Sequence, residues 1–284
     1  MRWILVVTVV AACGGASEAR TPAGERIVPV DGDLAEVVFA LGLGDEVVAT
    51  DLSATYPPEA DALPQIGYQR ALTAEPIAAF EPTLVLTTDL AGPPETLDQL
   101  RALDIPVVVI EREPTLDGPA AKIRAVAETL GVEERGEELV TELEADVDAA
   151  RAAAADVESR PRVLVLYVRG DQVQLIFGEG SGFDEVLPAV GAVDVAAELG
   201  IGETAQITAE AMVRAAPDVL VVTESGLQSV GGVDGLLSIP GIDRTPAGRT
   251  RRVLAYEDQY LLGGGPRFGQ MLQDLVADLH PDER

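Results

Sequence analysis

The chain has 284 residues, of which 47% are apolar and 24% are charged, and its formal net charge at pH 7 is −28. This composition is typical of a folded globular chain, and the length is sufficient for two domains. The acidic balance excludes nucleic acid as a partner, because phosphate binding requires clustered Lys and Arg, and it argues against adhesion to an anionic membrane surface.

The N-terminus has the pattern of a bacterial lipoprotein signal. Arg2 precedes the apolar run Trp3–Ala12, and small residues then lead to Cys13, the only cysteine of the chain. The run is too short to span a bilayer, which requires about 20 residues. We expect a signal peptide at residues 1–12, a lipid on Cys13 after cleavage, and a tether at residues 13–25 that anchors the protein to the extracytoplasmic face of the cell membrane. A buried helix with an incidental thiol is the alternative.

From residue 26 onward, short apolar runs alternate with helical patterns. The proline-rich loop PPEADALPQIGYQR interrupts this alternation at residues 57–70. The segments RIVPV, EVVATD, TLVLTT and PVVVIE predict strands, and LAEVVFALGLG, TAEPIAAFEP and PETLDQLRALDI predict helices. The alternation favours a parallel sheet with helices on its faces, so we expect an N-terminal α/β lobe at residues 26–118.

Between residues 119 and 159 the pattern is helical only. The longer segment, 133–157, places Leu139, Leu143, Val147 and Ala150 on one stripe. At 1.5 Å per residue such a helix is about 37 Å long, the height of a small domain. We expect residues 119–159 to be an inter-lobe helical segment that acts as a rigid rod.

From residue 160 the first pattern returns. RVLVLYV resembles RIVPV, and LTAEPIAAFEPTLVLTT (72–88) is matched by ITAEAMVRAAPDVLVVT (207–223), with Thr, Ala, Glu, the central Pro and the final Thr in common. We therefore predict a second α/β lobe at residues 160–284. The predicted fold is α/β, with two lobes of mainly parallel sheets flanked by helices, one long helix joining them, and a ligand cleft between them.

Two Tyr-x-Arg elements are the strongest candidates for a site. GYQRALTAE places Tyr68 and Arg70 just ahead of a helix start, and LYVRG places Tyr167 and Arg169 at the end of a strand. Ligands of parallel α/β sheets bind beyond the carboxyl ends of the strands. If the lobes face each other, both tyrosines therefore reach one cleft.

The spacing within each element suggests a chemical role. In an extended segment, an Arg two positions away points to the same side as the Tyr and can donate a hydrogen bond to a phenolate oxygen. Phenolate favours ferric iron, and Tyr is one of the axial ligands used for haem. The alternative interpretation is an aromatic anchor with an Arg stacked over its ring.

Other chemically active residues are scarce. The only histidine, His280, lies in the C-terminal tail, where a side chain is more often solvated than ligating, and a His-based metal site is excluded by count. Asp31 and Asp33 follow the first strand, where turn formation and helix capping suit them. With so little His and Cys we do not expect an enzyme; a carboxylate-dependent enzyme is the remaining alternative of that class.

Further candidates lie near the predicted helix starts and glycine-rich turns. Glu75 and Glu210 hold the same place in the repeated TAE, where an acid complements the helix dipole or meets a two-fold partner. In LLGGGPRFG (261–269), tight turns are one explanation and contact of Arg267 with a ligand carboxylate is the other. Four aromatic side chains are candidates either for packing on a flat ligand or for the core: Phe177, Phe183, Tyr260 and Phe268.

Together with SVGGVDGLLSIPGI (229–242), these segments resemble the haem-binding lipoproteins of bacterial ABC haem importers, within the helical-hinge (class III) periplasmic-type solute-binding proteins. The resemblance covers about residues 26–280. It implies an extracytoplasmic receptor that captures ferric haem (hemin) between its lobes and delivers it to an ABC transporter permease for iron uptake, with haem as transported ligand and not as catalytic cofactor. The class-level motifs also occur in cobalamin and siderophore receptors, so a receptor of the same fold for a ferric siderophore or cobalamin is the alternative.

The resemblance also implies roles for individual residues. Tyr68 and Tyr167 are axial ligands of the haem iron, Arg70 and Arg169 steady their phenolates, and Arg267 lies near the haem propionates. Some relatives use His at one of the two ligand positions, whereas this chain has Tyr at both. Two arrangements stay open: both tyrosines on one iron, or one haem on each tyrosine in a stacked pair.

For Glu75 and Glu210 the resemblance implies docking onto arginines of the two subunits of a permease dimer. The rod-like helix is expected to permit only modest movement of the lobes. On this hypothesis, docking shifts the lobes and loosens the bond between iron and phenolate.

Overall fold

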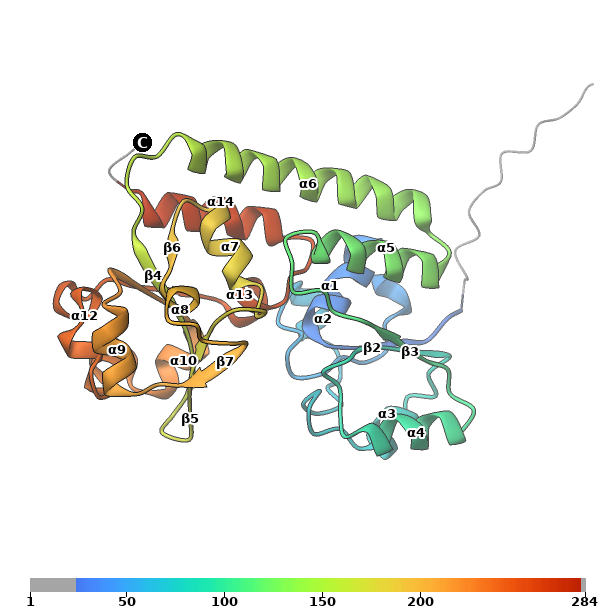
Figure 1. The fold of residues 1–284 in the computed structure, drawn as a ribbon. Coiled ribbons are helices and arrows are strands. Elements are labelled where there is room, and N and C mark those ends of the chain that lie inside the picture. Colours follow the sequence, from blue (N-terminus) through green and yellow to red (C-terminus); the bar gives the residue numbers. More distant parts are fainter. Residues whose placement is uncertain (1–23, 282–284) are drawn as a thin grey trace, which may run out of the picture.

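The computed structural model describes residues 24–281. The predicted signal peptide, the lipidated Cys13 and most of the predicted tether therefore lie outside the described residues. Two α/β lobes lie side by side beneath a layer of long helices (Figure 1). No helix within residues 24–281 is both long enough and apolar enough to cross a membrane.

The N-terminal lobe is built on a parallel sheet of three strands in the order β1-β2-β3. Its strands are β1 (Ile27–Val30), β2 (Leu84–Thr88) and β3 (Val107–Ile110), and its helices are α1 (Gly32–Ala40), the 3-10 turn η1 (Gly44–Glu46), α2 (Pro58–Asp61), α3 (Ala74–Ala78) and α4 (Pro94–Ala102). β1 and β2 are buried throughout, as expected for a parallel sheet covered on both faces.

The C-terminal lobe has a mixed sheet in the order β7-β5-β4-β8-β9, with β6 paired to β4. Its strands are β4 (Arg162–Arg169), β5 (Val173–Phe177), β6 (Val193–Asp194), β7 (Thr204–Gln206), β8 (Val219–Thr223) and β9 (Val253–Tyr256). Its helices are α7 (Phe183–Ala189), α8 (Val195–Glu198), α9 (Ala209–Ala215), α10 (Glu224–Ser229), α11 (Gly232–Ser238), η2 (Ile242–Arg244), α12 (Pro246–Thr250), α13 (Asp258–Leu262) and α14 (Phe268–Leu279). β4, β8 and β9 run parallel, whereas β5 is antiparallel to both of its neighbours.

The repeated segments fold alike, and the two-lobed α/β prediction is confirmed. In each lobe a short helix (α3 or α9) starts directly after the threonine of the repeat and is followed by a strand (β2 or β8) whose five residues are all buried. The strand that resembles RIVPV also behaves as its counterpart, because β4 pairs in parallel with β8 as β1 does with β2.

One strand prediction was wrong, and one strand was missed. EVVATD is not a strand, since this stretch makes only isolated bridges, Val47 to Ile27 and Thr50 to Gln65, as the chain turns into the proline-rich loop. The hairpin partner of β4 was missed, because VQLIF is short, follows a polar turn and is paired only through the antiparallel edge formed by β4 and β7.

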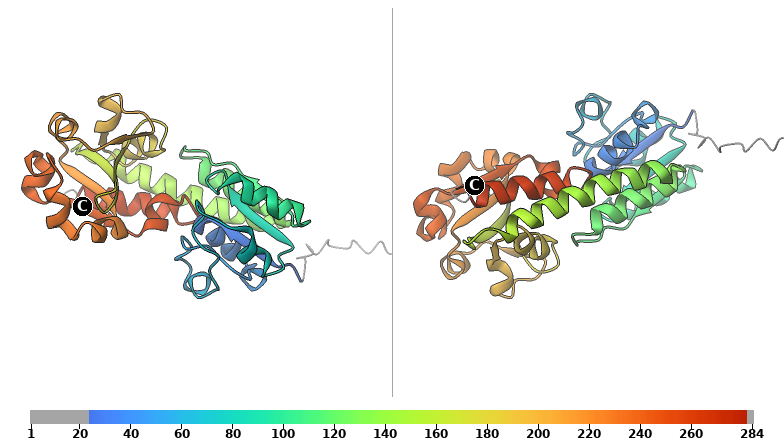
Figure 2. Two further views of the ribbon diagram at one scale, coloured as in Figure 1. Left: turned by 90° about the horizontal axis from the view of Figure 1, so that it is seen from below. Right: turned by 90° about the horizontal axis from the view of Figure 1, so that it is seen from above.

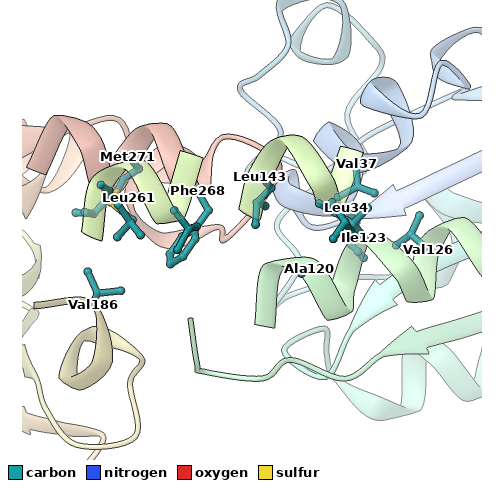
Figure 3. Close-up of a cluster of buried hydrophobic side chains, with 14 of the residues drawn as sticks. Leu34, Val37, Ala120, Ile123, Val126, Leu143, Val186, Leu261, Phe268 and Met271 are labelled. Atoms are coloured by element: carbon teal, nitrogen blue, oxygen red, sulfur yellow. The ribbon is translucent and has the colours of Figure 1, made fainter. Parts of the chain in front are cut away.

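The helical layer joins the lobes more extensively than a single rod. α5 (Gly118–Leu130) and α6 (Glu133–Ala155) lie against each other, and α14 from the end of the chain runs alongside α6 (Figures 1 and 2). One apolar cluster continues beneath these helices from the N-terminal lobe into the C-terminal lobe (Figure 3). It includes Leu34 and Ile123 on one side, Leu143 in the middle, and Phe268 and Met271 on the other.

The contact between α6 and α14 is close enough to require a glycine. A Cβ atom at Gly269 would lie 2.4 Å from Asp146 Cβ and 3.0 Å from the carbonyl oxygen of Leu143. The backbones of the two helices therefore meet where the lobes join, and the absence of a side chain on α14 permits this approach.

We predict that Gly269→Ala lowers the free energy of unfolding by about 1–3 kcal/mol, because the added methyl group must push α14 away from α6. Urea denaturation followed by circular dichroism measures the change. Gly202→Ala is the matched control, since its Cβ atom would have no neighbour within 4 Å, and we expect a change within about 0.5 kcal/mol there. Equal denaturation midpoints for the two variants would contradict the close-packing argument.

Candidate functional site

The two tyrosines of the Tyr-x-Arg elements meet between the lobes. Tyr68 comes from the N-terminal lobe and is 40% exposed, whereas Tyr167 is half-buried on β4 of the C-terminal lobe. Burial raises the pKa of Tyr68 above the ordinary phenol value of 10.0, and the neighbouring Tyr167 raises it further. The Arg70 and Arg169 guanidinium groups act in the opposite direction and lower that pKa. Tyr167, Arg70 and Arg169 therefore all influence the ionisation of the Tyr68 phenol, so the two Tyr-x-Arg elements lie close together.

The loop that carries Tyr68 is fixed from behind by backbone bonds. The Leu52 amide donates to the Gly67 carbonyl at 2.9 Å, and the Gly92 amide donates to the Gln69 carbonyl at 2.9 Å. The Gln69 side chain points inward, is 8% exposed and donates to Asp31 Oδ1 at 3.3 Å. Gln69 therefore anchors the loop on its buried side, while its sequence neighbour Tyr68 stays exposed.

Asp31 and Asp33 belong to a buried polar cluster. Asp31 precedes α1 without a side-chain cap bond, which corrects its predicted capping role, whereas Asp33 Oδ1 accepts from the Leu34 amide in the first turn at 2.8 Å. Asp31 has φ 117° and no side-chain cap bond; it accepts from Thr88 Oγ1 at 3.0 Å. Burial, followed by the charge of Asp33, raises the pKa of the Asp31 carboxyl well above its ordinary value, and Lys122 opposes this. Lys122 forms a buried ion pair with Asp33 and also donates to the Gly263 carbonyl at 2.7 Å.

Arg169 stacks on its tyrosine instead of bonding to the phenol oxygen. Its guanidinium carbon lies 4.4 Å from the centroid of the Tyr167 ring. The same guanidinium forms an ion pair with Asp258 and donates to Thr223 Oγ1 at 3.0 Å. Of the two interpretations of the spacing, stacking describes Arg169, and the same guanidinium lowers the pKa of Tyr68.

The aromatic candidates divide between the site and the core. Phe177 meets the Tyr167 ring edge-to-face at a centroid distance of 6.0 Å, so it stays a candidate for contact with a ligand. Phe183 and Phe268 are only 7% and 8% exposed and belong to the shared apolar core, so of the two interpretations the core describes them. Tyr260 is also turned away, since its hydroxyl donates to Asp274 Oδ2 at 2.8 Å.

Arg267 has a protein partner in place of the predicted ligand carboxylate. Its Nε and Nη2 donate to the two oxygens of Glu36, each at 2.9 Å, and Glu36 is only 4% exposed. The guanidinium carbon lies 3.6 Å from the Tyr56 ring centroid and 5.0 Å from that of Tyr260. Arg267 therefore bridges the two lobes, because Glu36 is on α1 and Arg267 directly precedes α14.

Glu75 and Glu210 are exposed in the first turns of α3 and α9. Both helices lie on the side of the lobes away from α6 (Figure 1). A shallow groove of about 700 Å³ between α3 and α4 adjoins Glu75 and is lined mainly by Ala78, Ala79 and Leu103. The two acids are thus accessible on a common side of the molecule.

His280 is buried, which corrects the expectation of a solvated tail. It is 3% exposed, and its ring nitrogens lie 3.1 Å from the Val190 carbonyl oxygen and 3.2 Å from Ser159 Oγ. Its contacts tie the end of α14 to the C-terminal lobe. Within residues 24–281 no group of three or more His, Cys, Asp or Glu side chains is placed to hold a metal ion.

Several residues of the site were missed in the sequence. Leu52 is 53% exposed beside the Tyr68 loop, Asp258 holds Arg169, and Gln259 bonds across the lobes. Of these three, only Leu52 could have been recognised in the sequence, because it is an apolar residue between two polar ones in a loop. Asp258 and Gln259 occur in YEDQY, which has the polarity of an ordinary surface turn.

Comparison with known proteins places the chain in a family. The family described as periplasmic binding protein matches residues 27–260. The chain belongs to this family. Among solved structures it is similar to the periplasmic heme-binding protein RhuT from Roseiflexus sp. RS-1, in apo form, with 49% identity and a TM-score of 0.89 over 92% of this chain and 99% of that one. It is also similar to the periplasmic heme-binding protein BhuT in complex with two hemes, with 35% identity and a TM-score of 0.84 over 92% of this chain and 99% of that one.

Curated proteins of the family give two further likenesses. The chain is 24% identical to the ABC transporter substrate-binding lipoprotein YvrC of Bacillus subtilis, over 91% of this chain and 81% of YvrC. It is 23% identical to the vitamin B12-binding protein of Pectobacterium carotovorum, over 70% of this chain and 71% of that protein. These similar proteins are solute-binding proteins and not enzymes.

Proposed function

We propose that this chain is an extracytoplasmic haem receptor that delivers haem to an ABC transporter. The observation that carries the proposal is the meeting of Tyr68 and Tyr167, one from each lobe, with Arg70 and Arg169 beside them. The likeness to RhuT and BhuT supports haem as the ligand.

The donor set fits ferric haem. Phenolate is a hard anionic ligand used for haem iron, and guanidinium groups near the oxygens offset part of the negative charge. Phe177 beside the Tyr167 ring and the exposed Leu52, whose backbone is bonded to the Tyr68 loop, offer apolar surface that suits a flat, largely apolar ring. Haem is the transported ligand, and the protein performs no chemistry on it.

The tyrosines must part to admit the ligand. Tyr167 lies close enough to Tyr68 to raise its pKa, so an iron ion bonded to either oxygen must enter between neighbouring phenols. If both phenolates hold one iron, a small separation suffices; if each holds its own haem in a stacked pair, the separation must be larger. Iron stoichiometry distinguishes the two arrangements.

A vitamin B12 receptor of the same fold is the second candidate, supported by the likeness to vitamin B12-binding proteins. A cobalamin brings its own cobalt ligands and does not require two phenolates with adjacent guanidinium groups. Competition between hemin and cyanocobalamin for the purified protein separates the candidates, and the Tyr-x-Arg pairs favour hemin.

We predict that Tyr68→Phe and Tyr167→Phe each weaken the binding of ferric haem by about 100-fold or more, because loss of a metal ligand exceeds the 10- to 100-fold effect of an outer-shell change. Titration with hemin, followed by its absorption spectrum, measures the affinity and shows the loss of the tyrosinate signature. Tyr256→Phe is the matched control, because its hydroxyl bonds to Asp278 at 2.7 Å away from the site. Unchanged hemin affinity in the Tyr68→Phe, Tyr167→Phe double variant would refute the site.

We also predict that haem binding releases protons. The raised pKa keeps Tyr68 protonated at neutral pH, whereas iron binds the phenolate, so the proton must leave when the bond forms. Raising the pH therefore strengthens binding, by about tenfold per pH unit for each phenol that ionises. Calorimetry in buffers of different ionisation enthalpy counts the protons. One proton per haem indicates one ligating tyrosine and two indicate both, whereas an affinity independent of pH between 6 and 9 would contradict phenolate ligation.

Anchoring and docking complete the proposal. The lipoprotein relative supports a lipid on Cys13, which would hold the receptor at the membrane beside its permease. Glu75 and Glu210, exposed on one side of the two lobes, would each pair with a cationic side chain of one permease subunit.

We predict that the double variant Glu75→Gln, Glu210→Gln lowers haem uptake by a reconstituted transporter about tenfold or more, because both charge pairs are lost. Hemin affinity of the isolated protein should stay unchanged. The control double variant Glu138→Gln, Glu142→Gln removes two exposed acids from α6 and should transport normally. Normal uptake by the Glu75, Glu210 variant, or weakened hemin binding in it, would count against docking through these acids.

A further inference from the structure

The side chain of Gln259 crosses from one lobe to the other. It starts from α13, is 7% exposed, and its Nε2 donates to the Gly32 carbonyl at 2.8 Å and to the Tyr56 carbonyl at 3.0 Å. Its Oε1 accepts from the backbone amides of Thr55 at 2.9 Å and Tyr56 at 3.0 Å. Both ends of the amide are thus satisfied by the backbone of the N-terminal lobe.

The surroundings of Gln259 are adapted to this crossing. A Cβ atom at Gly32 would lie 2.2 Å from the Ser53 carbonyl oxygen and 2.9 Å from Gln259 Oε1, so the glycine that the Ser53 backbone requires also leaves room for the amide. Gln259 Nε2 also donates to Glu36 Oε2 at 2.9 Å, and Glu36 is held in turn by the two bonds from Arg267. A buried amide with this many bonds is strongly specified, because each unmade bond would leave a buried polar group without a partner.

On its C-terminal side, Gln259 is one residue from the group that holds Arg169. Asp258 accepts from Arg169 and from Ser225 Oγ, the latter at 2.6 Å. The Arg169 guanidinium is thereby kept over the ring of Tyr167. Any shift of α13 is therefore passed to the Tyr167–Arg169 element.

On its N-terminal side, Gln259 holds the loop that leads to Tyr68. Thr55 and Tyr56 continue from Leu52, whose amide donates to the Gly67 carbonyl next to Tyr68. Thr55 Oγ1 also donates to Glu257 Oε1 at 2.8 Å, a second bond between the lobes at the start of α13. The segment 257–259 is therefore bonded to both Tyr-x-Arg elements through short paths.

We infer that Gln259 is a positioning residue that sets the spacing of Tyr68 and Tyr167 and thereby the hold on the iron. The inference rests on the proposed function for its ligand, but the spacing of the lobes is measurable without haem. Gln259 does not touch the tyrosines; it acts through the loop 52–56 and through Asp258. Without the hydrogen bonds of Gln259, the separation of the lobes varies. The phenol oxygens of Tyr68 and Tyr167 then no longer contact the ligand at the same time.

The primary test is Gln259→Met, which keeps the volume and removes every hydrogen bond. We expect the dissociation rate of hemin to rise about tenfold or more, as for outer-shell partners of metal ligands. The distance between spin labels at Leu103→Cys and Val213→Cys, exposed on separate lobes, should broaden in a Cys13→Ser background without hemin. Gln273→Met is the matched control, because its amide donates to Asp146 at 3.0 Å on the helical side, and it should match the unaltered protein in both measurements.

Gln259→Glu provides a second variant of the same shape, for use if Gln259→Met does not fold. Its carboxylate would face the Gly32 and Tyr56 carbonyls and Glu36, so we expect broader distances and faster dissociation than in Gln259→Met. If folded Gln259 variants give the distance distribution and the dissociation rate of Gln273→Met, the inference is overturned. If the unaltered protein does not bind hemin, the proposed function fails, whereas the distance measurement still decides whether Gln259 fixes the lobes.

Discussion

The two lobes share one apolar core beneath α6, which packs against α5 above the N-terminal lobe and against α14 above the C-terminal lobe, and everything else in the structure depends on this core (Figure 1). The core continues from Leu34 to Met271 without a break at the junction of the lobes (Figure 3). Apolar packing of this extent resists large separations, because parting the helices would expose buried surface to water. The lobes are therefore joined firmly on the helical side. The change in lobe separation that entry of a ligand requires occurs on the opposite side, where the contacts are polar.

The polar contacts are arranged as bridges between lobes and not as isolated pairs. Lys122 pairs with Asp33 and also donates to the Gly263 carbonyl of the C-terminal lobe. Glu36 meets Arg267, and Gln259 connects α13 to the loop before Tyr68. A buried charge is expensive to leave alone, so each of these acids requires its cation to stay in place. In a chain with a net charge of −28, basic residues that are kept buried or stacked serve particular partners and do not merely balance the surface. This explains how so acidic a protein holds guanidinium groups near its tyrosines.

The sequence allowed prediction of whatever depends on local pattern. Apolar runs of four or five residues predicted β1, β2 and β8, and the apolar stripe along 133–157 predicted α6. Buried parallel strands and long helices are recognisable because the spacing of their apolar residues follows the period of the element. The Tyr-x-Arg spacing brought together residues that do meet. Contacts between residues distant in the chain could not be predicted. Glu36 lies in a helix 231 positions before Arg267, and nothing in LLGGGPRFG indicates that its arginine pairs with an acid. The antiparallel β5 was missed for the same reason, since its pairing is set by the edges of β4 and β7.

The neighbouring phenols of Tyr68 and Tyr167 have a consequence for the order of events in capture. Burial and the charge of Tyr167 raise the pKa of Tyr68, so the loss of its proton is opposed before a ligand arrives. A metal centre has to supply the positive charge that draws this proton off, and Arg70 and Arg169 assist because both lower the same pKa. A centre too weakly charged to displace the proton would not be retained, so the protonated phenol selects for a strongly charged metal.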